Sequence, residues 1–498
     1  MGKELFLGID LGTTGCKVLL LQADGRIVDQ DYVDYPIYTP KAGFAEQDPE
    51  EWWNGLCRIS RRMTDRNRSV LSDIIGIGIC GQMHTHVYLD KQQKVLRRAI
   101  TWMDQRCEDE VAEIRSDPEK DRIIFENTAN FATTTYTCPK ILWVKRHQVE
   151  IYNQTAKVLL AKDYIKYKLT GEMITDYSDA AGTLLFDVIN RRWASEVFTL
   201  FGLRPNLMPE VAKSALVIGH LTGEAALATG LPQGIPVING AADHTAHALG
   251  AGVYQDTETT MQIGTSGAIN VCSDRPIPDP LSRTACWNFC LEDKWVILGL
   301  TQTAGKSLDW FRHTFDENSD DRVFQLYNRK TKEIPDGSEG LIYLPYLMGE
   351  RCPHWNAKAR GVFFGIDLKH TKYHFVKAIM EGVAFGLREN LEVIESLGIV
   401  PAGLKLLGGA SNSDEWREIF AKILNKKLIT TNVKETGARG SSLLCGLALG
   451  LYSSMEDVPK DLEEQEDMIF YPEMSAVYQR SFTLYKKIYR SIKDLYAL

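Results

Sequence analysis

The chain has 498 residues, of which 44% are hydrophobic and 24% charged, and its formal net charge is −8. This balance is typical of folded globular proteins and excludes a largely disordered chain. The length exceeds one ordinary core, so we expect two or more domains. The acidic balance argues against a nucleic-acid-binding surface or one that binds anionic membranes.

The ten cysteines are spread along the chain, and their spacing matches no zinc motif. We expect buried thiols in a reducing compartment. The N-terminus has no apolar core of a signal peptide. The apolar stretch 443–452 is too short to span a bilayer. The sequence therefore predicts a cytoplasmic protein without membrane contact.

The chain opens with a predicted antiparallel meander. Residues 5–9 and 17–22 read as strands joined by a Gly-Thr-Thr-Gly turn at 12–15, and a third strand starts at Ile27 after Asp24-Gly25. The turn can bind phosphate, because glycines let the backbone approach and amides and Thr hydroxyls donate. Asp10 could hold Mg²⁺ and Lys17 adds a positive charge. The alternative is an ordinary turn, and no Walker A motif is present.

Residues 81–84 (Gly-Gln-Met-His) and 102–106 (Trp-Met-Asp-Gln-Arg) combine polar and aromatic side chains. Sugars bind such mixtures, because hydroxyls need donors and acceptors while C–H faces pack on rings.

Asp243 follows the apolar run 235–238 and three small residues. An acid at a strand end faces an open crevice, so Asp243 is a candidate base; a buried structural Asp is the alternative. The nearby His244 and His247, with His84 and His86, have no standard metal-site spacing.

The opening pattern returns at 259–272, where two predicted strands flank a Gly-Thr-Ser-Gly turn at 264–267. Two such units suggest a duplicated architecture whose turns grip a triphosphate from both sides; chance similarity is the alternative.

Three further segments have clear patterns. Residues 408–412 (Gly-Gly-Ala-Ser-Asn) precede a predicted helix from Trp416, with Ser411 and Asp414 as a capping box, and could form a nucleotide platform. Residues 327–340 read as a surface loop. The aromatic stripe 478–496 predicts a C-terminal helix packed on a core.

Two longer stretches carry a family resemblance. Residues 361–366 (Gly-Val-Phe-Phe-Gly-Ile) with 374–381 resemble the C-terminal signature of the FGGY carbohydrate kinases, and residues 137–147 resemble the N-terminal one, from which the chain departs at Thr135. Segments 81–84 and 346–354 are most similar to those of the xylulokinases within this family. The resemblance runs from about residue 5 to the C-terminus.

The resemblance implies an α/β fold of two actin-like, RNase H-like domains, at 1–252 and 253–498, with an active-site cleft between them. It implies ATP-dependent phosphorylation of a small sugar, with D-xylulose as the first candidate. Gluconate, ribulose, a polyol and a signalling sugar are alternative substrates. The protein could form a homodimer. It assigns the roles as follows: Asp243 as base; Asp10 and Asp243 near Mg²⁺; Thr13, Thr14, Lys17, Gly264, Thr265, Gly305, Gly408, Gly409 and Asn412 near ATP; Met83, His84, Trp102, Tyr136, Asp243 and His244 near the sugar.

An alternative of another class is an actin-like ATPase that acts as a binding or scaffold protein. Such a protein has no need of a sugar pocket around Met83 and His84, so these residues argue for the kinase.

Overall fold

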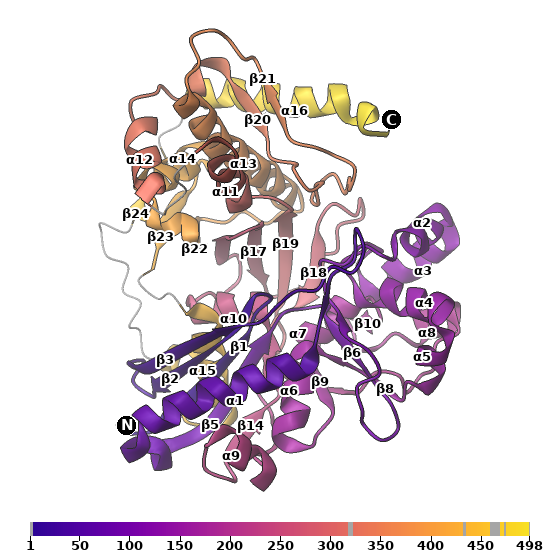
Figure 1. Cartoon of the computed structure of the whole chain (residues 1–498). Coiled ribbons are helices and arrows are strands. Elements are labelled where there is room, and N and C mark those ends of the chain that lie inside the picture. The colour runs from indigo at the N-terminus through magenta and orange to yellow at the C-terminus, as the bar shows by residue number, and fades with distance from the viewer. Residues whose placement is uncertain (1–2, 317–321, 432–434, 459–468, 473–474, 498) are drawn as a thin grey trace.

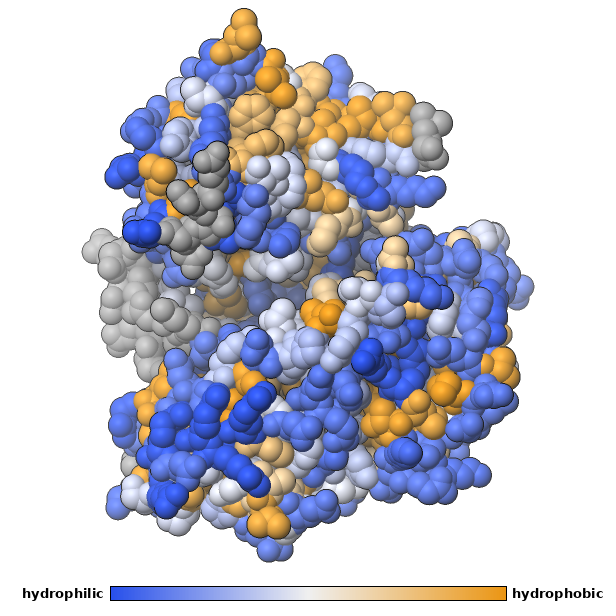
Figure 2. Space-filling view, viewed as in Figure 1, coloured by the Kyte–Doolittle hydropathy of each residue, from blue (hydrophilic) through white to orange (hydrophobic). Residues whose placement is uncertain are grey.

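The computed structural model describes residues 3–316, 322–431, 435–458, 469–472 and 475–497. The N-terminal half forms one lobe, and most of the C-terminal half forms a second lobe beside it (Figure 1). A space-filling view shows an indentation where the two lobes meet (Figure 2). Each lobe is built around one seven-stranded sheet.

The first sheet has the order β13-β14-β5-β1-β2-β3, with β15 also paired to β5. β1 pairs antiparallel with β2 and parallel with β5. The strands are β1 (Leu5–Leu11), β2 (Gly15–Gln22), β3 (Ile27–Asp34), β5 (Ile74–Gly81), β13 (Val217–His220), β14 (Pro236–Ile238) and β15 (Ala241–Ala242).

The second sheet, in the order β18-β19-β17-β16-β22-β23-β24, repeats this plan. β16 pairs antiparallel with β17 and parallel with β22, as β1 does with β2 and β5. Its strands are β16 (Thr259–Ile263), β17 (Gly267–Ser273), β18 (Ala285–Asn288), β19 (Trp295–Thr301), β22 (Gly403–Gly408), β23 (Lys427–Thr430) and β24 (Ile469–Phe470). The predicted duplication of the two Gly-Thr hairpins in an actin-like fold is therefore confirmed.

Four smaller sheets complete the strand pairing among the described residues. They are β4 (Glu46–Gln47) with β7 (Ala99–Ile100), β6 (His86–Leu89) and β8 (Lys157–Leu160); β9 (Ile174–Asp176) with β12 (Glu210–Ala212); β10 (Phe186–Asp187) with β11 (Arg192–Trp193); and β20 (Ile342–Leu344) with β21 (Val362–Phe364).

Helices cover the sheets and extend the first lobe. Those of the first lobe are α1 (Pro49–Arg66), α2 (Glu108–Ser116), α3 (Pro118–Thr128), α4 (Thr137–His147), α5 (Val149–Gln154), α6 (Ala161–Thr170), α7 (Tyr177–Ala180), α8 (Ser195–Phe201), α9 (Gly223–Thr229) and α10 (Asp243–Gly250). The later ones are α11 (Gly305–Phe315), α12 (Arg322–Thr331), α13 (Lys372–Ser396), α14 (Asp414–Leu424), α15 (Thr436–Ala448) and α16 (Ala476–Ile492).

Alternation along β1 distributes its side chains between two cores, because successive side chains point to opposite faces. Leu7 and Ile9 pack in one core with Trp52 of α1, whereas Phe6 packs in the other with Leu444 of α15. α15 belongs to the C-terminal half of the sequence, yet it lies on the first sheet. The domain boundary at 252/253 stays a prediction.

Glycine allows this close contact between helix and sheet. A Cβ at Gly8 of β1 would lie 2.1 Å from the carbonyl oxygen of Ala438, and one at Gly78 of β5 would lie 2.0 Å from that of Ser441. Larger residues would push α15 away from the strands.

Two local predictions were wrong. Ser413, not Ser411, caps α14, because its side chain accepts from the Trp416 amide at 3.2 Å, while Ser411 lies in a short 3₁₀ turn (Gly409–Asn412). The stretch 327–340 is not all loop, since α12 runs to Thr331 and buries Tyr327. The C-terminal helix is confirmed as α16, although Tyr496 lies beyond it in a 3₁₀ segment.

All ten cysteines are free thiols, and nine of them are buried. Within the described part of the chain, no helix is long and apolar enough to cross a membrane.

Candidate active site

A cavity of about 740 Å³ lies between the lobes and takes side chains from both. Its lining includes eleven of the predicted site residues: Asp10, Thr13, Thr14, Lys17, Met83, His84, Trp102, Asp243, His244, Gly264 and Thr265. Segments separated by some 250 residues in sequence thus meet at one place.

The first hairpin contributes a carboxylate and hydroxyl groups. Asp10 lies near the end of β1, directly across the strand pair from Lys17 of β2. The Oδ1 atom of Asp10 is buried and has no hydrogen-bond partner, so it has an unmet need for a donor or a cation. The turn residues Thr13 and Thr14 line the cavity beside it.

Lys17 is held by an acid from the other half of the sequence. Its Nζ lies 2.9 Å from Oε2 of Glu435, which precedes α15. Burial alone would lower the pKa of Lys17, but the ion pair with Glu435 outweighs it and the pKa is raised. The side chain therefore presents a permanent positive charge at the cavity.

Asp243 lies at the end of β15 and is the first residue of α10. Both β15 and β1 pair with β5, and Ala241 and Asp10 both lie opposite Cys80. The register therefore places Asp10 and Asp243 at neighbouring strand ends. This agrees with the expectation that Asp243 follows a strand.

The half-buried carboxyl group of Asp243 has an unusual acidity. Burial raises its pKa, His247 lowers it and Asp10 raises it, and together these effects leave the pKa at about 7. Oδ1 accepts from the His244 amide at 2.8 Å, which fixes the side chain. A carboxylate with a pKa near neutrality is suited to accept a proton during a reaction.

His84 is held in one orientation and one tautomer. Its φ of 65° is left-handed, a strained region that clusters at functional sites. Nδ1 lies 2.5 Å from the carbonyl oxygen of Gly182, and a carbonyl only accepts, so Nδ1 carries the proton. Burial lowers the pKa of His84 well below its usual range, so the ring is neutral. Nε2 is then an acceptor.

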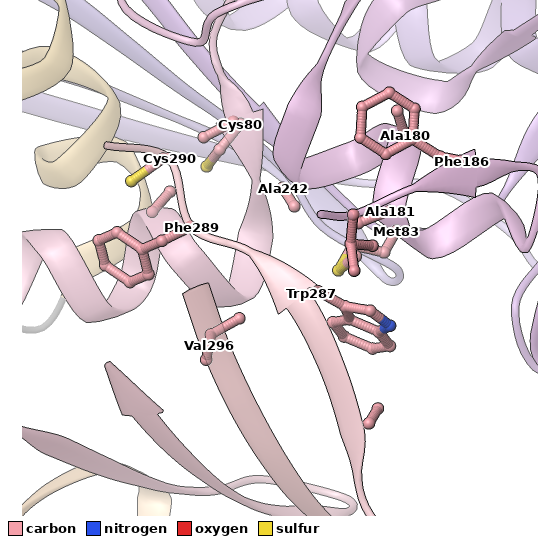
Figure 3. Packing of buried hydrophobic residues seen from close by; sticks show 14 of the residues in the cluster. Cys80, Met83, Ala180, Ala181, Phe186, Ala242, Trp287, Phe289, Cys290 and Val296 are labelled. Carbon is pink, nitrogen blue, oxygen red and sulfur yellow. The ribbon is translucent and has the colours of Figure 1, made fainter. Parts of the chain in front are cut away.

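Aromatic rings surround this histidine. The rings of Tyr136 and Trp287 meet the His84 ring edge-on, with centroids 5.3 and 5.2 Å away. Trp287 comes from β18 of the second sheet and faces Met83 (Figure 3). Tyr136 lies behind the cavity rather than in its lining, and its hydroxyl accepts from the Trp287 indole at 3.1 Å.

Trp102 and His244 complete the predicted sugar side. The indole nitrogen of Trp102 donates to Thr13 Oγ1 at 2.9 Å, which joins the predicted sugar side to the first hairpin. The Arg351 guanidinium lies 5.0 Å from the Trp102 ring. Burial lowers the pKa of His244 to about 4, and its Nδ1 is buried without a partner.

The remaining predicted nucleotide residues lie around the second hairpin. The Gly305 amide donates to the Gly264 carbonyl at 2.9 Å, and Gly408 lies opposite Ile263 at the end of β16. Gly409 and the exposed Asn412 follow in the 3₁₀ turn. Gly305, Gly408, Gly409 and Asn412 lie outside the cavity lining itself.

Sequence reasoning missed Trp287 and Arg351, which both line the cavity. A single Trp in a strand carries no local signal. Arg351 lies in the segment 346–354, which resembles that of the xylulokinases, but nothing in the sequence of that segment indicates a contact with Trp102.

A duplicated α/β fold, with two Gly-Thr hairpins and a carboxylate facing a polar and aromatic pocket, defines an ATP-dependent sugar kinase. The chain belongs to the FGGY family of carbohydrate kinases: the model of the family's N-terminal domain matches residues 5–250, and that of its C-terminal domain matches residues 260–449.

Relatives that match over nearly the full length of the chain are also carbohydrate kinases. The chain is 35% identical to a xylulose kinase of Bacillus subtilis (98% of this chain, 97% of the relative) and 30% identical to a gluconokinase of the same organism (91% and 89%). The structure of a ligand-bound xylulose kinase from Lactobacillus acidophilus superposes with a TM-score of 0.92 at 27% identity, over 99% of each chain.

Proposed function

We propose that this enzyme transfers the γ-phosphoryl group of ATP to the terminal primary hydroxyl of a small acyclic sugar. The preferred candidate is D-xylulose, and the product is then D-xylulose 5-phosphate. The observation that carries the proposal is the Asp243 carboxyl group, with its pKa of about 7, in a cavity shared by His84 and the two hairpins. The similarity to xylulose kinases supports the choice of sugar.

In this mechanism Asp243 accepts the proton of the sugar hydroxyl while the oxygen of that hydroxyl bonds to the γ-phosphorus of ATP. The bond from that phosphorus to the bridging oxygen of ADP breaks, and ADP carries away the electron pair. Such reactions depend on positioning and charge neutralisation more than on covalent chemistry. Lys17 and the hydroxyls of Thr13 and Thr265 can donate to the phosphate oxygens.

The residues also fit the magnesium ion that ATP brings. Hard divalent cations take oxygen ligands, and Asp10 offers a buried Oδ1 without a partner at the cavity. We propose that Asp10 holds Mg²⁺ with help from Asp243. The ion would supply positive charge to the phosphates.

His84 provides the orientation of the sugar. Because the Nδ1–H of His84 donates to the Gly182 carbonyl, only the lone pair of Nε2 is left for the sugar. This nitrogen can accept a hydrogen bond from a sugar hydroxyl. The hydroxyl groups of an aldose, a ketose or a polyol are such donors. The keto oxygen of a ketose only accepts, so it cannot be the partner of Nε2. Met83 and Trp287 offer apolar surface to the carbon chain.

An ADP-release assay on D-xylulose, ribulose, gluconate, glycerol and erythritol tests the proposal. We expect the highest kcat/KM for D-xylulose and a ten- to hundredfold loss for it in His84→Ala, since an unpaired polar group costs about 1–3 kcal/mol. Exposed His220 provides the matched control, and His220→Ala should behave as wild type. If gluconate or erythritol outruns D-xylulose, the sugar assignment is wrong.

One observation favours a second candidate, a sugar acid. The Arg351 guanidinium lines the cavity, and a guanidinium binds carboxylates in two-point fashion. The similarity to a gluconokinase points the same way. A preference for gluconate that Arg351→Ala abolishes would select this candidate.

A further inference from the structure

Five ionisable side chains of α6, β9 and α7 form a fully buried cluster in the first lobe. Lys162 Nζ lies 2.7 Å from Asp163 Oδ1, 2.8 Å from Asp176 Oδ1 and 3.0 Å from Asp179 Oδ2, and Lys166 Nζ lies 2.9 Å from Asp163 Oδ1. None of the five is accessible to solvent. The kinase mechanism above uses none of them.

The cluster is costly as a purely structural element. Taking charges out of water costs several kcal/mol per ion, and apolar replacements are often neutral or stabilising. Burial raises the pKa of Asp179 to about 8 in spite of the attraction of Lys162. Asp179 therefore keeps its proton at neutral pH. This cost points to a role other than stabilising the fold.

From the cluster, Asp176 reaches the catalytic segment through one serine. Asp176 Oδ2 accepts from the Ser178 amide at 2.9 Å, from the Ser178 hydroxyl and from the Ser214 hydroxyl at 2.7 Å. The same Ser178 oxygen accepts from the amide of Ala242 at 2.9 Å. Ala242 directly precedes Asp243.

Lys166 holds the other end of that segment. Its Nζ donates to the Asn239 backbone carbonyl at 2.8 Å and to Oδ1 of the same residue at 2.5 Å. Residues 239 and 242 are therefore both tied to the cluster, and they lie at the two ends of the short segment that precedes Asp243.

The same segment also reaches the sugar side. Ser178 and Asp179 lie in α7, which continues into the 3₁₀ turn Ala181–Thr183. Within that turn, the Gly182 carbonyl accepts from His84 Nδ1 at 2.5 Å. Figure 3 shows Ala180 and Ala181 of this segment beside Met83 and Ala242. One short segment thus contacts the supports of both Asp243 and His84.

We propose that the buried cluster is a positioning device for catalysis. It fixes α7 through Asp176, and α7 holds the Asp243 backbone through the Ser178 hydroxyl and the His84 ring through the Gly182 carbonyl. Ser178 and Asp176 are positioning residues, because neither lines the cavity. The inference rests on the proposed role of Asp243 as the base.

Ser178→Ala tests the step that reaches Asp243. It removes the acceptor of the Ala242 amide but leaves the Gly182 carbonyl in place. Misplacement of a catalytic group by about 1 Å can cost a hundredfold, so we expect kcat for D-xylulose to fall ten- to hundredfold. The KM for ATP and the calorimetric Kd for D-xylulose should stay within about twofold of wild type. Ser178→Thr keeps the hydroxyl and should recover kcat.

Thr229→Ala is the matched control. Thr229 is buried, and its hydroxyl accepts from the Leu231 amide at 3.3 Å, as Ser178 does from Ala242. It ends α9, at the far end of the first lobe (Figure 1). Thr229→Ala should lower Tm by a similar amount and leave kcat unchanged.

Asp176→Asn tests the cluster itself and should reduce both kcat and affinity for D-xylulose. If that variant does not fold, Ser178→Ala still decides. A wild-type kcat in folded Ser178→Ala, or an equal kcat loss in Thr229→Ala, overturns the positioning role. An active Asp243→Asn variant instead overturns the base assignment, and the inference with it.

Discussion

Replacing Asp243 by Asn is the sharpest single test of the catalytic assignment. The amide has nearly the shape of the carboxylate, and its Oδ1 can keep the 2.8 Å hydrogen bond from the His244 amide. The fold and the cavity should therefore persist. What is lost is the ability to take a proton at a pKa of about 7.

The expected loss follows from that role. General-base catalysis contributes about 10²–10⁴ in rate, which is about 3–5 kcal/mol of barrier at 1.36 kcal/mol per factor of ten. A coupled assay for ADP at saturating ATP and sugar measures kcat, and calorimetric titration with ATP measures binding. We expect kcat to fall by that factor while the Kd for ATP stays within a few-fold.

Asp90→Asn is the control for the change of charge, because Asp90 lies in a turn outside the cavity lining and caps the amides of Gln92 and Lys94. It should keep wild-type kcat. Turnover within a few-fold of wild type in Asp243→Asn would refute the base assignment, even if ATP binding were unchanged.

Further predictions concern closure of the two lobes, ATP hydrolysis without sugar, the pH dependence of stability and the length of the sugar that the cavity accepts. Sugar should compact the molecule, because both lobes line one cavity, and an unchanged radius of gyration in X-ray scattering at saturating sugar and nucleotide would exclude closure. Slow ATP hydrolysis without sugar should fall in Asp243→Asn; if it persists, it arises elsewhere. Asp179 keeps its proton up to pH about 8 when folded but loses it near pH 4 when unfolded. Its contribution to the stability of the wild type therefore falls as the pH rises between these values. The Tm of Asp179→Asn relative to wild type should therefore rise from pH 6 to 8.5 in calorimetry, and a constant difference would contradict the assignment. Trp102 and Arg351 also line an adjoining cavity of about 540 Å³, so Arg351→Ala should raise kcat/KM for six-carbon ketoses relative to D-xylulose by about tenfold; unchanged ratios would show that Arg351 does not limit chain length.

The strand–turn–strand units were predictable because their signals are local. Apolar runs of strand length flank glycine and threonine at both hairpins, and β1, β2, β16 and β17 form where the pattern indicates. His84 follows β5 and Asp243 follows β15, and the structure brings both to the cavity. The residues alone made Asp243 only a candidate base, since a lone acid after small residues fits a structural Asp equally well, and the family resemblance favoured the catalytic role.

Contacts between the lobes could not be predicted in the same way. Trp287 approaches His84 only because β18 of the second sheet packs against the first lobe. Ser411 and Ser413 fit a helix cap equally well in sequence, and the 3₁₀ turn at 409–412 decides for Ser413. The cluster around Lys162 combines residues of α6, β9 and α7, so no spacing pattern reveals it.

The position of α15 explains why both halves of the chain are needed for the proposed chemistry. The helix follows β23 of the second sheet in sequence, but it packs on the first sheet beside Asp10, where a Cβ at Gly437 would lie 2.6 Å from the Asp10 Oδ2 atom. Just before it, Glu435 pairs with Lys17, and Thr436 at its start bonds to His247 Nδ1 at 2.8 Å. The surroundings of Asp10 are thus completed by the C-terminal half. The second hairpin at 264–267 stays with the other sheet. A rotation between the lobes would therefore move this proposed phosphate-binding turn relative to Asp10, while the contacts that support Asp10 stay fixed.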